Sequence, residues 1–232
     1  MKLCSLICES MTWDDLDGLT VPGHRLVHFD PHPATMSAQS LWCMQTDQPL
    51  PPARGNPHEG TNWFDGVDMI SLRHPTRLIS NFWPKAYDPI RIDPDVADPV
   101  GKKVGVEPDN HQWHTMQAYL ASPGAHEWLV YWPTLGHAGY RVQAENKGIP
   151  PHIRETTRVW FKLMAEHLLP KIQCPTIIFS DHGSARFIRT RDEQFRNGFA
   201  FVPDGFPFPD AMSSAAMTWA DMRALQEGIL CS

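Results

Sequence analysis

The sequence lacks an apolar run of the roughly 20 residues that a membrane-spanning helix needs. Its opening apolar residues run into Glu9 too early for the leader of a secreted protein. Basic runs are also missing, and the net charge of −6 argues against a surface that binds nucleic acid. We therefore expect a soluble, cytoplasmic protein with no membrane segment and no nucleic-acid partner.

Paired C-x-x-C spacing is absent as well. The five cysteines, an odd number, fit free thiols in a reducing compartment better than a disulfide framework or a zinc site. Cys4, Cys8 and Cys174 lie in or beside predicted strands, so we expect them in the core. With 232 residues, 42% of them apolar, the chain is long enough for one sizeable core. We expect a single domain over residues 1–232.

One stretch, Thr176 to Gly183, combines a strand pattern with an abrupt polar end. Residues 176–179 are β-branched or aromatic and too few for a helix, so they predict a buried parallel strand. Asp181 and His182 then offer a carboxylate oxygen and an imidazole nitrogen at the strand end, where open α/β sheets bind ligands. The same pair also fits an ordinary exit from a strand into a loop.

Two earlier segments also have polar side chains beside a predicted element, one after a strand and one at the start of a helix. The apolar residues 2–8 predict the first core strand, and Glu9 follows it. A helix pattern over residues 35–44 begins at Thr35, whose hydroxyl would lie among the free N–H groups of the helix amino terminus. Taken alone, Glu9 is better explained as a solvated side chain, and Thr35 as a helix cap.

The remaining elements are read from the same patterns. Strands are predicted at 76–80 and 127–132, and helices at 152–170 and from Ser213 or Ser214 to about Glu227.

Residues 21–34 carry His24, His28 and His32 at four-residue intervals, but the prolines among them exclude a helix. We predict an irregular loop there, with these histidines only as a reserve metal set. Asp14, at a predicted helix start or turn, is a reserve ligand.

Residues 177–183, Ile-Ile-Phe-Ser-Asp-His-Gly, resemble the metal-binding Ser-Asp-His-Gly segment of the alkaline phosphatase superfamily, in its sulfatase-like branch. Residues 6–10, Leu-Ile-Cys-Glu-Ser, are similar to the first strand of lipoteichoic acid synthases and phosphoethanolamine transferases, where a metal-binding Glu precedes Ser. The order of the acid, the Thr at the next helix start and the distant Asp-His also agrees with that family. The resemblance covers most of the chain. It implies an α/β three-layer sandwich with a mostly parallel central sheet, trimmed because the chain is short.

The resemblance also implies one metal site, formed by Glu9, Thr35, Asp181 and His182. Three oxygen donors and one nitrogen suit a divalent ion, Mn²⁺ or Zn²⁺ before Mg²⁺. Thr35 would act as a nucleophile on phosphorus and form a covalent phospho-Thr intermediate. His137 lies in a Gly-rich segment similar to the family's Gly-Ser-His-Gly-Pro stretch, and it would hold the substrate phosphate.

The expected function is that of a metal-dependent phosphoric-ester hydrolase or phosphotransferase acting on a small phosphate ester or a similar anion. Sulfatase chemistry is disfavoured, because Thr35 cannot mature to the formylglycine that those enzymes use. Two departures favour an alternative, a non-catalytic sulfatase-like protein with a binding or structural role. Pro133 stands where two-zinc members carry Asp, and no His follows His182. The oligomeric state and the choice between hydrolase and transferase stay open.

Overall fold

The computed structural model of the chain describes residues 3–8, 11–34, 37–50, 66–70, 76–79, 91–92, 127–132, 151–167, 169–181, 197–206 and 216–232. These residues form a mixed α/β fold around one sheet, with strand order β2-β7-β6-β1-β5-β3-β4. Its strands are β1 (Leu3–Cys8), β2 (His24–Phe29), β3 (Thr76–Ile79), β4 (Arg91–Ile92), β5 (Glu127–Trp132), β6 (Thr176–Ser180) and β7 (Gly198–Pro203). Its helices are α1 (Trp13–Leu16), α2 (Ser37–Gln45), α6 (Pro151–His167) and α7 (Trp219–Cys231), with a 3₁₀ turn at Leu169–Lys171. None of the helices described is long and apolar enough to cross a bilayer.

Strand β1 lies in the interior of the sheet and pairs in parallel with β5 on one side and β6 on the other. Strands β3 and β4 continue the parallel part beyond β5, whereas β7 is antiparallel to both β6 and β2. All six residues of β1 are buried, because both faces of the sheet are covered there. A strand in that setting is a continuous apolar run, which is why the sequence identifies it. The predicted strands at β1, β3, β5 and β6, and the α/β class, are confirmed.

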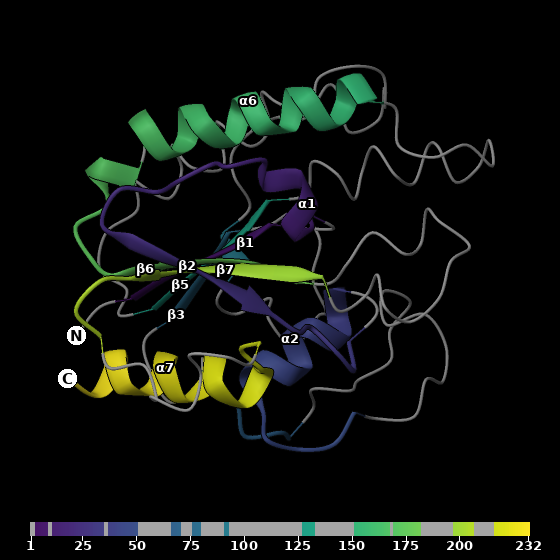
Figure 1. Ribbon diagram of the computed structural model, residues 1–232. Coiled ribbons are helices and arrows are strands. Elements are labelled where there is room, and N and C mark those ends of the chain that lie inside the picture. Colours follow the sequence, from purple (N-terminus) through teal and green to yellow (C-terminus); the bar gives the residue numbers. More distant parts are fainter. Residues whose placement is uncertain are drawn as a thin grey trace.

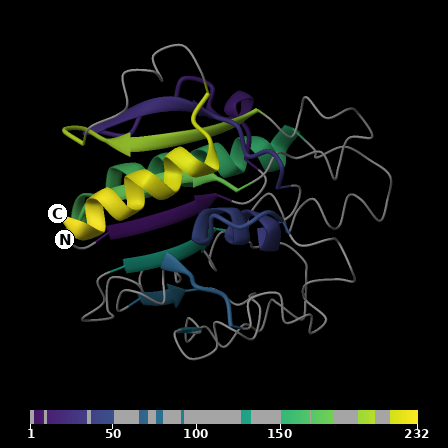
Figure 2. The ribbon, with the colours of Figure 1, turned by 90° about the horizontal axis from the view of Figure 1, so that it is seen from below.

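Helices lie on both faces of the sheet (Figure 1), with α1 and α6 on one face and α2 and α7 on the other. Figure 2, a view from the side of α7, shows α7 and α2 in front of the sheet. Alternate residues of each central strand belong to the cores on opposite faces of the sheet. Ile7 belongs to the core under α2 and α7, and Leu6 belongs to the core under α6. Aromatic side chains contact each other in both layers, with Phe179 against Trp219 on one face and Phe161 against Phe201 on the other.

The helix ends follow local chemistry. Helix α6 stops at His167, and the 3₁₀ turn that follows contains Pro170, which cannot continue an α-helix. Helix α7 begins at Trp219, later than predicted. Thr218 caps it, because the Thr218 N–H donates to the Asp221 carboxylate at 2.8 Å and the Asp221 N–H donates to the Thr218 hydroxyl at 3.4 Å. Met217 is held in a bridge to Phe29, so the chain is still extended at that residue.

The prediction of an irregular loop over residues 21–34 is wrong for its central part. Residues 24–29 form strand β2, which pairs with β7 over its whole length. The prolines that exclude a helix, Pro31 and Pro33, lie beyond the end of the strand and do not interrupt its hydrogen bonds. Strand β7 was not identified from the sequence, although its apolar run Phe-Ala-Phe-Val is bounded by Gly198 and Pro203.

Candidate functional site

Three parallel strands end side by side. Cys8, the last residue of β1, pairs with Ser180 of β6 and with Trp132 of β5. The carboxyl ends of β1, β5 and β6 therefore form one row at one edge of the sheet. In open α/β sheets this edge is where ligands bind.

Asp181 is a charged residue that the structure describes at this edge. It follows β6 directly and is only 2% exposed. Its backbone carbonyl accepts a hydrogen bond of 2.5 Å from the Ser40 hydroxyl of α2. Ile7, Met44 and Trp219 pack around the same place. This hydrogen bond fixes α2 against the end of β6. The Asp181 carboxylate is buried at the same place, and burial of a charge costs free energy unless other groups compensate it.

Burial and the Asp181 carboxylate both affect the pKa of the Cys8 thiol. Burial raises the pKa of Cys8 well above its usual value, and the negative charge of Asp181 raises it further. The thiol therefore stays protonated at neutral pH, and it is not a reactive thiolate. Asp181 directly follows Ser180, which pairs with Cys8 at the end of β1.

On the other side of β6, Gly198 of β7 lies close to Ser180. The Phe199 N–H donates to the Ser180 hydroxyl at 3.0 Å. A Cβ atom on Gly198 would lie 2.7 Å from the Phe29 carbonyl oxygen and 2.7 Å from the Ser180 hydroxyl, so only glycine fits there. Sequence reasoning missed this close approach. The available signal was the glycine itself, at the first position of an apolar run.

Of the predicted site residues, the structure describes Asp181. Glu9, Thr35, His137 and His182 lie outside the described residues. Their convergence on one ion stays a prediction. Elements that adjoin three of them in the sequence do come together: β1 ends one residue before Glu9, Asp181 directly precedes His182, and α2 begins two residues after Thr35.

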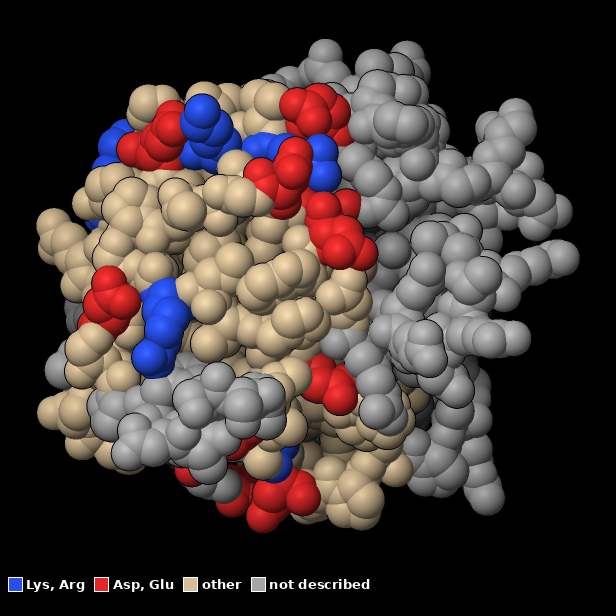
Figure 3. All heavy atoms as spheres, viewed as in Figure 1, with Lys and Arg blue, Asp and Glu red and all other residues tan. Residues whose placement is uncertain are grey.

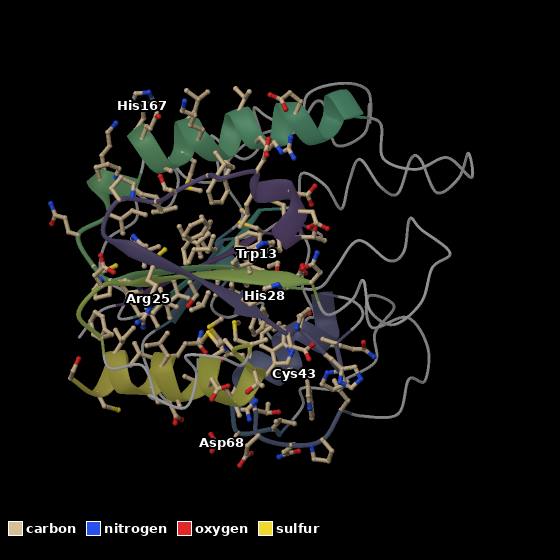
Figure 4. All side chains as sticks on the ribbon, in the orientation of Figure 1. Trp13, Arg25, His28, Cys43, Asp68 and His167 are labelled. Carbon is tan, nitrogen blue, oxygen red and sulfur yellow. The ribbon has the colours of Figure 1, made fainter. Side chains whose placement is uncertain are left out.

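Among the residues that the structure describes, neither the histidine set nor Asp14 belongs to a cluster that could hold a metal. His24 lies with its two ring nitrogens 2.9 Å from the carbonyl oxygens of Pro22 and Thr176. The ring of His28 stacks on Trp13 (Figure 4), with ring centroids 4.4 Å apart. The Asp14 carboxylate accepts a hydrogen bond from the Asn197 amide at 2.9 Å. Within the described ranges, no three His, Cys, Asp or Glu side chains gather in a way that could hold a metal.

The described cysteines carry no disulfide. Cys4, Cys8 and Cys43 are buried, Cys174 is partly buried and Cys231 is exposed. The core positions predicted for Cys4 and Cys8 are confirmed.

Comparison with known proteins gives little. No protein-family model matches the chain, and no curated protein matches it. Among solved structures, the chain is similar to the C-terminal periplasmic domain of EcEptC from Escherichia coli, at 14% identity and a TM-score of 0.45. The match covers 99% of this chain and 81% of that chain. A similarity at this level assigns neither a family nor an activity.

One prediction requires correction on this finding. The sequence led us to expect a cytoplasmic location, whereas the similar solved structure is a periplasmic domain. The cytoplasmic prediction is withdrawn, and no compartment is assigned in its place.

Proposed function

We propose that the chain is a metal-dependent phosphoric-ester hydrolase or phosphotransferase with Thr35 as its nucleophile. The observation that carries the proposal is the place of Asp181: a buried carboxylate at the carboxyl end of β6, beside the end of β1 and against α2. In the resemblance drawn from the sequence, β1, α2 and β6 are the elements that supply the metal ligands. The proposal includes the finer fold, a trimmed three-layer sandwich like that of alkaline phosphatases.

The residues proposed for the metal fit a divalent ion. A carboxylate held at 2% exposure is a suitable cation ligand, and Glu9, Thr35 and His182 would complete a set of three oxygens and one nitrogen. Such donors suit Mn²⁺ or Zn²⁺, with Mg²⁺ less favoured. When bound, the ion would lower the pKa of the Thr35 hydroxyl and neutralise charge that develops on the phosphate.

The protein's own groups would perform the remaining steps. The Thr35 hydroxyl would lose its proton to solvent as its oxygen forms a bond to phosphorus. The bond from phosphorus to the ester oxygen would break, the leaving oxygen would take a proton from solvent, and a phospho-Thr intermediate would result. Water or an acceptor hydroxyl would then lose a proton and form a bond to phosphorus, and the Thr35 oxygen would leave and be protonated again. His137 would hold non-bridging phosphate oxygens during both steps. The substrate is a small phosphate ester or a similar anion.

Incubation with generic phosphate mono- and diesters, in the presence of Mn²⁺ or Zn²⁺, tests the proposal. The expected result is turnover, or a mass increase of one phosphoryl-containing group localised to Thr35. Thr35→Ala should lose both, whereas Thr35→Ser keeps an oxygen in place and should retain part of the activity. His137→Ala should lower the rate without removing the ion.

Wild-type protein that binds metal but gives neither turnover nor adduct, and does not bind a phosphate or phosphonate analogue, would contradict the catalytic claim. The non-catalytic alternative would then be the better account. Pro133 and the absence of a histidine after His182 are the sequence features that favour it.

A further inference from the structure

Strand β7 ends in a proline that interrupts its hydrogen bonding with β6. The Phe199 N–H donates to the Ser180 hydroxyl of β6, so Phe199 directs its backbone groups towards β6. Backbone groups of a strand point to alternate sides, and Pro203, four residues later, therefore faces β6 as well. Continuing the register of the two strands places Thr176 opposite Pro203. Since proline has no N–H, the Thr176 carbonyl cannot receive a hydrogen bond from it.

The side chain of His24 supplies a donor at this place. His24 lies opposite Pro203 on the other side of β7, in strand β2. Its ring nitrogen Nε2 is 2.9 Å from the Thr176 carbonyl oxygen, and its Nδ1 is 2.9 Å from the Pro22 carbonyl oxygen. Thr176 is buried, and a buried carbonyl without a donor costs free energy. An N–H at Nε2 thus replaces the one that Pro203 lacks.

The two carbonyl contacts make the protonation state of His24 important. A carbonyl oxygen only accepts hydrogen bonds, and a neutral imidazole has one N–H. In the neutral ring, one nitrogen therefore directs a lone pair at a carbonyl oxygen, and that contact is not a hydrogen bond. The imidazolium has an N–H at both nitrogens and can donate to both carbonyls. Protonation of His24 thus adds one hydrogen bond at this end of the sheet.

The charged residues on the segments that adjoin His24 form no ion pair with it in the described part of the chain. These segments contain Arg25 beside it in β2, Asp204 after β7, and Lys171 and Cys174 before β6. Charged side chains gather along α6 and are sparse over the middle of the face on which β2 lies (Figure 3). The carbonyl contacts, rather than a carboxylate partner, therefore distinguish the two protonation states.

We propose that His24 forms a pH-sensitive link between β2 and β6 across the end of β7. The protonated ring donates to both carbonyls and stabilises this end of the sheet, and loss of the proton at higher pH removes one of the two hydrogen bonds. His24 lies at the start of β6, whereas Asp181 follows the end of that strand, so the link is independent of the proposed metal site.

Thermal unfolding of wild type and His24→Gln between about pH 8 and about pH 5, the range in which histidine changes charge, tests the link. The glutamine amide keeps a donor but does not titrate. The two midpoints should be close at the higher pH. At the lower pH, wild type should exceed His24→Gln by about 2–4 °C, the shift expected for one additional hydrogen bond in a chain of this length. The other histidines titrate in both proteins and cancel. His32→Gln, at an exposed histidine, is the control, and its difference from wild type should stay nearly constant with pH.

Two further variants test the physical cause. Pro203→Ala restores an N–H opposite Thr176, so His24→Ala should lower the midpoint less in Pro203→Ala than in wild type. The pH-dependent difference between wild type and His24→Gln should persist when both also contain Asp204→Asn. A difference that is the same at both ends of the pH range, or that disappears with Asp204→Asn, would overturn the link. An equal cost of His24→Ala with and without Pro203→Ala would overturn it as well.

Discussion

At the scale of single residues, Gly198 leaves no room for a side chain beside the end of β6. Replacement by alanine would place a methyl group 2.7 Å from the Phe29 carbonyl and the Ser180 hydroxyl, both held within the sheet. We expect Gly198→Ala to lower the free energy of unfolding by about 1–3 kcal/mol, the usual cost of overpacking. Gly228→Ala is the matched control, because nothing lies within 4 Å of the added Cβ and α7 should gain about 0.5–1 kcal/mol. Urea unfolding measures both changes, and equal effects would contradict this account of Gly198.

The buried thiol of Cys43 should make the free energy of unfolding depend on pH. Burial raises the pKa of the Cys43 thiol from about 9 to about 11, although the guanidinium of Arg223 opposes the rise. The folded chain thus holds this proton more tightly than the unfolded chain. The resulting contribution to stability is fully present below pH 9 and is lost as the pH rises towards 11.

Cys43→Ala removes this contribution. The difference in unfolding free energy between wild type and Cys43→Ala should therefore shrink as the pH rises from about 9 to about 11, the interval between the unfolded and folded pKa. Cys8 titrates in both proteins and cancels from the comparison. Denaturant unfolding across this range gives the two curves, and parallel curves would show that the pKa of Cys43 is not raised by folding.

At the scale of elements, one buried polar pair joins α7 to the central strand. The Gln226 amide nitrogen donates to the Ser5 hydroxyl at 3.1 Å, and both side chains are fully buried. Ser5→Ala would leave that amide without its acceptor, so we expect a loss of about 1–3 kcal/mol in the free energy of unfolding. Adding Gln226→Leu removes the stranded amide and should recover most of the loss. A double variant less stable than Ser5→Ala would show that the pair is not what makes the single change costly.

Each element that the sequence predicted has a local residue pattern that identifies it without knowledge of the tertiary fold. Strands β1 and β6 are buried on both faces and appear as apolar runs, and α6 has an apolar stripe and a proline beyond its end. Strand β2 escaped prediction because it lies at an edge of the described sheet and half its residues are polar or exposed. Its place is set by pairing with β7, from Phe29 with Gly198 to His24 with Pro203, which are far apart in the sequence. Local patterns contain no such information.

At the scale of the whole molecule, two core layers hold the ends of three parallel strands in one row. Asp181 was predicted from its place after a buried strand, and the structure puts it at that row, nearly excluded from solvent. The partners that fix its surroundings, Ser40 and Gly198, could not be predicted, because each meets the site only through the tertiary fold. Glu9, Thr35, His137 and His182 remain predictions from the sequence.

The most direct test of the central claim is metal binding by Asp181. Wild-type protein titrated with Mn²⁺ or Zn²⁺ should bind close to one ion per chain and show a higher thermal midpoint by linkage. Asp181→Ala should lose both effects yet fold, because alanine keeps the backbone carbonyl that Ser40 contacts. Asp204→Ala, a change at an exposed aspartate, should behave as wild type. The same ion uptake and the same rise in midpoint in Asp181→Ala as in wild type would contradict the account.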